Sequence, residues 1–351
     1  MTPKVRASVI GAGWYAAQNH IPTLAARGDV LLDGVSRLGT EELARVKDHF
    51  GFVFASEDYG AVLARKPDVV VVASPHHLHF EHARAAIESG AHVLCEKPMT
   101  LVPEEAWELT RLARHHGRHL LIANGYNYLP HVNVLANRVA AGAIGNIEHA
   151  AVSFISATRD VFEGDRGLRQ WETAMFRPDR GTWQDPAQGG GFAYGQLSHA
   201  LALLLYVSGL APETIAGHVL AHNGIDLANS ASLLLSNGAV AGISGAAAMP
   251  QGNRALMRLS LAGDAGLLTA DFDTDRAEIR RHDGLIETMP LRTGDWIYNC
   301  VGPVNALVEL AQGRGDNRSS GTAGAQAVGI IAGLLQSARA GGAPQPVRGA
   351  P

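Results

Sequence analysis

Residues 8–18 read SVIGAGWYAAQ, in which an apolar run leads directly into a Gly-x-Gly-x-x-Ala pattern. The run before the first glycine is short and rich in β-branched residues, which is typical of a buried parallel strand. The stretch 14–28 has apolar residues at helical spacing and ends in Gly28, which suits a helix C-cap. The sequence therefore predicts a strand, a glycine turn and a helix in succession.

This arrangement suits the binding of a dinucleotide at the turn. Gly11 permits the tight turn, Gly13 lets a pyrophosphate approach the backbone, and the small Ala16 allows the helix to pack closely on the strand. The N–H groups at the helix start would then bind the phosphates. Trp14 and Tyr15 follow the turn directly, so we expect them to line either the cofactor cleft or the contact with a second domain.

Strand and helix patterns alternate through the first third of the chain. Further strands are expected at 29–37, 68–75, 92–98 and 119–125, with helices between them. Such alternation predicts a parallel sheet with right-handed crossovers, which makes residues 1–125 a Rossmann domain. Ligands of such sheets bind beyond the carboxyl ends of the strands. The residues expected near those ends are Ser36, Ser74, Pro75, His76, Lys97 and Asn127.

The end of the second strand indicates which cofactor is favoured. An Asp or Glu commonly binds the ribose 2′-hydroxyl of NAD there, but this chain has Ser36 followed by Arg37, and Asp33 falls mid-strand. A carboxylate would repel a 2′-phosphate, whereas a hydroxyl and a guanidinium hold one. The sequence therefore favours NADP(H), with NAD as the alternative. The other interpretation of Arg37 is a solvated loop charge.

Four histidines, His76, His77, His79 and His82, raise the question of a metal site. Their spacing fits no common ligand pattern, and no nearby cysteine or carboxylate completes a set. We therefore expect no metal ion. Roles in helix initiation and core packing are favoured, with His76 or His79 near the cofactor.

Composition narrows the possible functions. The chain has 351 residues, 18% of them charged, and a net charge of −4, which argues against a nucleic-acid partner. Its two cysteines, Cys95 and Cys300, cannot form a disulfide framework, so a reducing cytoplasm is the expected location. No signal peptide is recognised. The longest apolar run, 200–210, is about half the length of a membrane span, so no membrane partner is expected.

Residues 126–351 are expected to form a second domain that binds substrate and mediates oligomerisation. A strand is predicted at 146–157, and short alternating runs between 214 and 263 predict antiparallel strands. The Ser, Ala and Gly residues of these runs suggest a flat face that pairs with another subunit. The polar, glycine-rich stretch 158–191 is long enough to be functional and carries Trp183. A tryptophan among polar groups suits the binding of a carbohydrate. The alternative is that this stretch is a charged surface loop.

Three stretches together resemble a known family: the glycine turn, SPHHLHFEHARAAIESGAHVLCEKP (74–98) and GGGFAYGQLSH (189–199). Over nearly its whole length the chain resembles the family of glucose–fructose oxidoreductase, inositol dehydrogenase and the MocA proteins. The resemblance implies an α/β fold, with an N-terminal Rossmann domain and a C-terminal domain on a large, mostly antiparallel sheet. It also implies a homodimer or homotetramer formed through that sheet. Most members oxidise a sugar or polyol hydroxyl, or run the reverse reduction, with a nicotinamide cofactor.

Catalytic roles follow from the same resemblance. The family's catalytic lysine maps onto Lys97 and its catalytic histidine onto His199, and these two side chains and Trp183 are expected to contact the substrate. An apolar run follows His199, so we expect it at a helix N-terminus, where the dipole keeps the imidazole neutral and able to accept a proton. Lys97 either has a lowered pKa or stays charged and polarises the reacting oxygen. We expect His199 to carry the proton, Lys97 to orient the oxygen, and Glu96 to orient Lys97 or the cofactor.

The chain departs from the family at three positions. Gly195 replaces a frequent Asp, Leu129 replaces an Arg, and Gln184 replaces the Arg of a Trp-Arg pair. These changes suggest a substrate pocket unlike that of the best-known inositol and glucose enzymes. Two other functions stay open: a redox-neutral, glycoside-processing enzyme that holds its NAD tightly, and a non-enzymatic dinucleotide-binding sensor.

Overall fold

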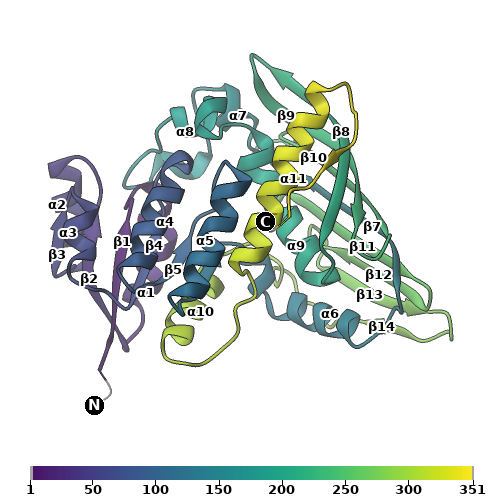
Figure 1. Cartoon of the computed structure of the whole chain (residues 1–351), viewed down its shortest axis with the longest axis horizontal. Helices are drawn as coiled ribbons and strands as arrows, with labels where there is room; N and C mark the ends of the chain where they lie inside the picture. The colour runs from purple at the N-terminus through teal and green to yellow at the C-terminus, as the bar shows by residue number, and fades with distance from the viewer. Residues whose placement is uncertain (1–2, 350–351) are drawn as a thin grey trace. The chain divides into compact units, whose positions relative to one another are not determined.

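The computed structural model describes residues 3–349, and the chain folds into two compact units (Figure 1). The first unit consists of the N-terminal residues up to Gly125, residues 170–182 and residues 299–325. The second unit consists of residues 126–169, residues 183–298 and the chain from residue 326 onward. Two segments that lie well beyond residue 125 in the sequence therefore belong to the N-terminal unit.

A six-stranded parallel sheet forms the centre of the first unit. The parallel sheet and five of its strands were predicted from the sequence, whereas the short strand Phe54–Ser56 was not. Its strand order is β3-β2-β1-β4-β5-β6, so the sheet grows in opposite directions from β1, and ligands of such sheets bind beyond the strand ends at this switch point. The side chains of β4 are buried along its whole length, because helices cover both faces of a parallel sheet. The strands are β1 (Val5–Ile10), β2 (Val30–Ser36), β3 (Phe54–Ser56), β4 (Val69–Val72), β5 (His92–Cys95) and β6 (Leu120–Ile122).

The helices of the first unit alternate with these strands. They are α1 (Ile21–Ala25), α2 (Thr40–Phe50), α3 (Tyr59–Leu63), α4 (His79–Glu88), α5 (Pro103–His115) and, from far along the chain, α10 (Val301–Ala311). Helix α10 packs against α1 and β5. The expected cap at Gly28 is wrong, because α1 ends at Ala25 and Ala26 is its C-cap.

A nine-stranded sheet forms the centre of the second unit, in the order β14-β13-β12-β11-β7-β10-β9-β8-β15. Its pairings are antiparallel except for the parallel pair β7 and β10, which confirms the expected mostly antiparallel sheet. The strands are β7 (Ile147–Ile155), β8 (Pro212–His222), β9 (Ile225–Leu235), β10 (Val240–Ala246), β11 (Leu256–Gly263), β12 (Gly266–Asp271), β13 (Arg276–Arg281), β14 (Ile286–Thr288) and β15 (Gln345–Pro346).

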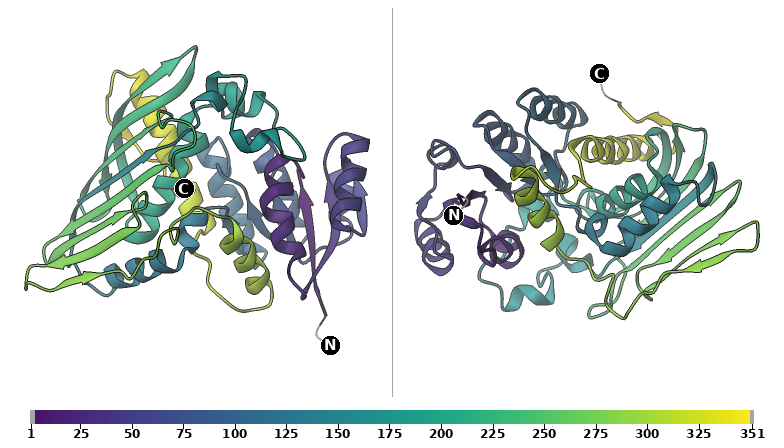
Figure 2. Two further views of the ribbon diagram at one scale, coloured as in Figure 1. Left: turned by 180° about the vertical axis from the view of Figure 1, so that it is seen from behind. Right: turned by 90° about the horizontal axis from the view of Figure 1, so that it is seen from below.

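Helices cover one face of this sheet (Figure 2). Helix α9 (Ser198–Ser208) packs on α6 (Pro130–Ala140), on β7 and on β11. The later part of α11 (Gly321–Arg339) lies on β8, where Leu334 would be 2.8 Å from a Cβ at Gly217. The stretch expected as one long loop contains the short helices α7 (Arg159–Glu163) and α8 (Gly181–Gln184).

Between residues 3 and 349, none of the helices has the combination of length and apolar composition that crossing a bilayer requires.

Candidate active site

The glycine turn after β1 is built by a close approach of two backbones. Gly11 has a φ of +79°, and a Cβ at this position would lie 2.3 Å from the backbone nitrogen of Ser74. No other residue type fits, because both the dihedral angle and the space exclude a side chain. Gly13 is different, since the nearest atom to a Cβ there would be the Gly11 oxygen at 3.9 Å. The space above Gly13 is therefore open, which fits the close approach of a diphosphate.

The two aromatic residues after the turn contact later segments of the same unit. The Trp14 indole donates a hydrogen bond to Gln18 Oε1 (2.6 Å) and meets the Trp171 ring edge to face at 5.3 Å. The Tyr15 hydroxyl lies 2.9 Å from Cys300 Sγ. Residues 14–20 continue into a π-helical segment, Ala16–His20, a distortion often found at functional sites.

The chain has Ser36 and Arg37 at the end of β2, and the negative charge of Glu42 acts on Arg37. Arg37 donates to the Ala12 carbonyl (3.3 Å) and its guanidinium lies 3.9 Å from the centre of the Phe176 ring. Asp33 is buried in mid-strand, where Arg6 (2.9 Å) and Arg65 (2.7 Å) bind its carboxylate. Burial raises the pKa of Asp33, but these two arginines outweigh it and the net shift is downward. Asp33 is therefore ionised and already paired.

Ser36 completes this strand end. Its hydroxyl donates to the Glu57 carbonyl (3.2 Å), and its own carbonyl accepts the N–H groups of Gly11 (2.9 Å) and Ala12 (3.1 Å). The ends of β1 and β2 are thus bonded directly to one another beside the glycine turn.

The histidine stretch after β4 links the glycine turn to the end of β5. The His79 ring is fully buried, and its two nitrogens lie 2.8 Å from the Ser74 carbonyl and 2.7 Å from the Pro98 carbonyl. His82 Nδ1 lies 2.9 Å from the Ser74 hydroxyl, and His76 is buried with its ring 5.8 Å from that of His79. Ring nitrogens of His79 and His82 are thus engaged by protein atoms.

Lys97 follows β5 and is buried together with Glu96. Glu96 Oε1 is 2.7 Å from His20 Nε2, and Glu96 Oε2 accepts the backbone N–H of Lys97 (3.1 Å). Burial lowers the pKa of Lys97, and the negative potential of Glu96 and Cys300 partly opposes that shift. Burial raises the pKa of Glu96, yet the hydrogen bond from His20 and the Lys97 charge bring it below its usual value. The direction of this shift agrees with the first of the two alternatives for Lys97, a lowered pKa.

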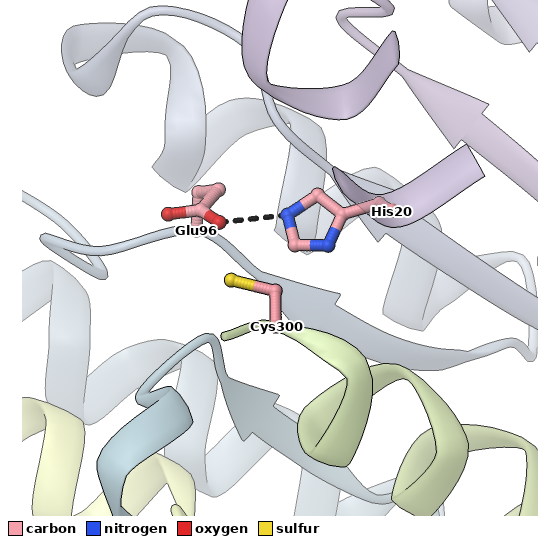
Figure 3. Close-up of side chains that lie close together, drawn as sticks. All are labelled: His20, Glu96 and Cys300. Carbon is pink, nitrogen blue, oxygen red and sulfur yellow. Dashed lines mark hydrogen bonds and ion pairs between the residues drawn. The ribbon is translucent and has the colours of Figure 1, made fainter. Parts of the chain in front are cut away.

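The side chains of His20, Glu96 and Cys300 point toward one another (Figure 3). Each contributes one nitrogen, oxygen or sulfur atom to a group whose members lie within 4.8 Å of one another, and all three residues are buried. They come from the helix after the glycine turn, the end of β5 and the start of α10. No local pattern connects them, so sequence reasoning did not find this group.

In the second unit, His199 lies inside a helix rather than at its start. A π-helical segment, Ala193–Leu197, runs without a break into α9, and the residue before α9, Leu197, is itself helical. The expected helix N-terminal position of His199 is therefore wrong, and the argument from the helix dipole does not apply to this residue. The ring is 7% exposed and meets three aromatic rings edge-on, those of Tyr298 (4.8 Å), Tyr126 (6.0 Å) and Phe154 (6.0 Å).

The glycine run before this helix makes room for a buried carboxylate. Asp226 in β9 accepts the backbone N–H of Ala193 (2.6 Å), and a Cβ at Gly191, whose φ is +109°, would lie 2.0 Å from Asp226 Oδ1. Asp226 thus caps the helix that carries His199. Burial raises the pKa of Asp226 to about 6. No local sequence pattern indicates this role of Asp226, because the pairing joins residues 33 positions apart.

The absence of a side chain at position 195 also has a structural reason. A Cβ at this position would lie 3.0 Å from the Phe162 ring and 3.4 Å from the Trp183 ring. Two aromatic side chains thus occupy the space that a larger residue would need. Asn127, also in this unit, is fully buried and its amide donates to the Ala202 carbonyl (3.4 Å).

The residues expected from the sequence thus fall into two sets. The second unit holds Asn127, Trp183 and His199. The first unit holds the others, and the structure joins several of them through Ser36, Gly11, Ser74 and His79. Those of the first unit are Gly11, Gly13, Trp14, Tyr15, Ser36, Arg37, Ser74, Pro75, His76, His79, Glu96 and Lys97.

Family models match most of the chain. Residues 5–124 match "Oxidoreductase family, NAD-binding Rossmann fold", and residues 132–269 match "GFO/IDH/MocA C-terminal domain". Among curated proteins, the D-glucoside 3-dehydrogenase of Escherichia coli is 34% identical over 144 residues, 41% of each chain. Glucose-6-phosphate 3-dehydrogenase of Bacillus subtilis is 33% identical over 147 residues, 42% of this chain and 41% of that protein. The chain spans about half the length of the curated relatives it matches.

Solved structures share the fold along the whole chain. An oxidoreductase domain protein from Kribbella flavida has a TM-score of 0.80 at 18% identity and covers 99% of this chain and 100% of its own. A levoglucosan dehydrogenase in complex with NADH has a TM-score of 0.78 at 18% identity, with the same coverage. At 18% identity, the similarity to these structures shows the fold of this chain and nothing more.

Proposed function

This chain belongs to the GFO/IDH/MocA family of oxidoreductases, and on that premise we propose that it is an NAD(P)-dependent dehydrogenase or reductase. The proposed reaction transfers a hydride between the nicotinamide and a hydroxyl-bearing carbon of a sugar, a sugar derivative or a polyol. The names of the two curated relatives, a glucoside dehydrogenase and a sugar-phosphate dehydrogenase, support the substrate class. Family membership follows from the matches described above, and the activity of this chain is our proposal.

The observation that carries the proposal is the pairing of an open glycine turn with a buried lysine. The turn leaves space above Gly13, and Lys97 lies buried at the end of β5, bonded through its backbone to Glu96. A bound nicotinamide cofactor supplies the hydride chemistry, while the protein must position the substrate and move a proton. A buried lysine beside a fixed carboxylate suits the first task, the positioning of the reacting oxygen.

We assign the proton-carrying role to His199 and the orienting role to Lys97. His199 is almost fully buried among aromatic rings, which restrict its orientation. The ammonium group of Lys97 stabilises negative charge that develops on the substrate oxygen. Trp183 and the polar residues near it are the proposed contacts for the carbohydrate C–H faces and hydroxyls.

We further propose that NADP(H) is preferred over NAD(H). Asp33 is paired with two arginines, so the carboxylate nearest to the strand end is not free to bind a ribose hydroxyl. Arg37 and Ser36 occupy the strand end instead, and a guanidinium binds a phosphate group strongly.

The uncovered face of the large sheet is the proposed subunit interface. Its lining is dominated by small side chains on neighbouring strands, including Ala151, Ser153, Ser230, Gly242, Ser244 and Ser260. Small residues let a second sheet approach closely, so we propose a homodimer or homotetramer paired through this face. Sedimentation velocity of the purified chain tests the assembly state.

A second candidate is a redox-neutral enzyme that oxidises and then reduces the same sugar on one cofactor. Gly195 favours it, because Phe162 and Trp183 fill the space beside this position and no carboxylate is present there. Such an enzyme would retain its cofactor through purification and would show no net reduction of added NAD(P).

The test is steady-state kinetics with a panel of sugars and polyols and with both cofactors. Lys97→Met and His199→Asn should each lower kcat by about 10²–10⁴-fold, since each removes acid–base or electrostatic assistance. Their melting temperatures and cofactor Kd values should change little. His77→Asn, an exposed histidine in the same stretch as His76 and His79, is the control and should keep full activity. An unchanged kcat in both the Lys97 and the His199 variant would contradict the proposal.

A further inference from the structure

Tertiary folding brings together three side chains that differ in ligand chemistry. His20 offers an imidazole nitrogen, Glu96 a carboxylate oxygen and Cys300 a thiol sulfur, all within 4.8 Å of one another. Figure 3 shows the sulfur of Cys300 directed at the space beside the His20–Glu96 hydrogen bond. The three residues are 0%, 8% and 3% exposed, in that order.

The donor atoms already contact one another or neighbouring polar groups. His20 is fully buried, yet its Nδ1 has no hydrogen-bond partner among the described residues, while Nε2 is bonded to Glu96. The His20 atom that faces Glu96 is Nε2, so a bound cation would replace the hydrogen bond between these two side chains (Figure 3). The Tyr15 hydroxyl lies 2.9 Å from the Cys300 sulfur and adds a fourth polar atom.

We propose that His20, Glu96 and Cys300 form a buried site for one thiophilic divalent cation, with Zn²⁺ as the ion that this nitrogen, oxygen and sulfur set fits best. Zinc bonds to these atoms are about 2.0–2.3 Å long, so tetrahedral ligands lie about 3.5 Å apart. The three atoms lie within 4.8 Å of one another, so cation binding requires the side chains to move closer together. Hard cations such as Mg²⁺ prefer oxygen ligands and do not suit the site.

A cation bound at this site repels the positive charge of Lys97. The Lys97 ammonium interacts electrostatically with both Glu96 and Cys300, so a divalent cation on these two groups removes its partners and repels its charge. On binding, the thiol of Cys300 gives its proton to solvent and the sulfur bonds to the metal as a thiolate. The binding itself does not depend on the proposed oxidoreductase activity.

Titration of the whole purified chain with Cd²⁺ tests the site, because cadmium–thiolate bonds absorb in the near ultraviolet. We expect a charge-transfer band that saturates at one equivalent of Cd²⁺ and that Zn²⁺ competes away. Cys300→Ser should remove the band, and Glu96→Gln or His20→Asn should weaken binding at least tenfold. Cys95→Ala is the matched control, since Cys95 is a buried thiol in β5 whose sulfur donates toward the Met99 carbonyl and lies outside the cluster.

A second measurement uses only the unmodified chain and so does not depend on how the variants fold. The ¹¹³Cd NMR shift of the one-equivalent complex should indicate one sulfur ligand with nitrogen and oxygen ligands. A band absent at a hundredfold excess of Cd²⁺, a band that persists in folded Cys300→Ser, or a shift without sulfur coordination would overturn the proposal.

Discussion

The backbone of Ser74 occupies the place where a side chain at Gly11 would begin, 2.3 Å from the position of the missing Cβ. This contact joins the end of β1 to the end of β4. Ser74 is held in turn by His79, whose ring bridges to the carbonyl of Pro98, directly after Lys97. The glycine turn and the lysine therefore belong to one connected set of loops in the first unit.

This relationship predicts opposite results for the two glycines of the turn. Gly11→Ala must move the Ser74 backbone and adopt a positive φ, so it should lower the free energy of unfolding by about 3 kcal/mol. Gly13→Ala meets no atom within 3.9 Å and should change stability by less than about 1 kcal/mol. Its methyl group would instead fill the space above the turn and weaken NAD(P) binding. Thermal melts and fluorescence titrations measure the two effects, and equal stability losses in both variants would contradict the interpretation.

Arg37 should determine the preference for the 2′-phosphate. Arg37→Ala should raise the Kd for NADP by about 10–100-fold, since a hydrogen bond to a charged group contributes about 1.5–3 kcal/mol. The Kd for NAD should change less than about threefold. Arg45→Ala is a matched control, because the Arg45 guanidinium also lies near the Phe176 ring, at 5.8 Å. If wild type binds NADP no better than NAD, the assignment of Arg37 fails.

Gly195 should tolerate a carboxylate only when its neighbour is smaller. In Gly195→Asp the new Cβ lies 3.0 Å from the Phe162 ring, and such overpacking should cost about 1–3 kcal/mol of unfolding free energy. Combining it with Phe162→Leu should recover part of that loss, with a coupling of about 1 kcal/mol in a double-mutant cycle. Urea unfolding of the four proteins gives the coupling. Strict additivity would show that Phe162 is not what excludes a side chain at position 195.

Asp226 should make stability depend on pH between about 4 and 6. Burial raises its folded pKa to about 6, above the usual value of about 3.9, so the folded chain binds more protons in this interval. The contribution of this group to stability is therefore greatest below pH 4 and falls by about 3 kcal/mol as the pH rises through 6. Relative to Asp226→Asn, the wild type should lose that amount between pH 4 and pH 7.

Asp275 is the control, because its pKa is shifted in the opposite direction to that of Asp226. The hydrogen bond from Arg254 lowers its pKa to about 2, so its stabilising effect is present above pH 4 and is lost as the pH falls toward 2. Between pH 4 and pH 7, the difference between wild type and Asp275→Asn should therefore stay nearly constant. A flat difference for Asp226→Asn over the same range would contradict the raised pKa of Asp226.

Several features of the fold follow from local sequence. The six parallel strands were predicted in part from short β-branched runs followed by helical spacing, since burial on both faces of a sheet requires such runs. The glycine turn was predictable because its dihedral angles and close contacts exclude other residues. Asp33 was correctly placed in mid-strand by counting along β2.

Other features depend on residues far apart in the chain. The helix of His199 starts earlier than its apolar run indicates, because Asp226 from β9 satisfies a backbone N–H at Ala193. Tyr15 and Cys300 meet across 285 positions, since α10 returns to the first unit. No periodicity encodes such pairings.

By itself, the sequence determined the alternation of strands and helices, the glycine turn and the lysine-bearing end of β5, because each depends on neighbours within a few residues. Only the tertiary structure decided which carboxylates are buried and paired, what fills the space beside Gly195, and that His20, Glu96 and Cys300 converge. Those outcomes depend on packing between distant segments, and the free energy of burial is set by whichever side chains the fold brings together.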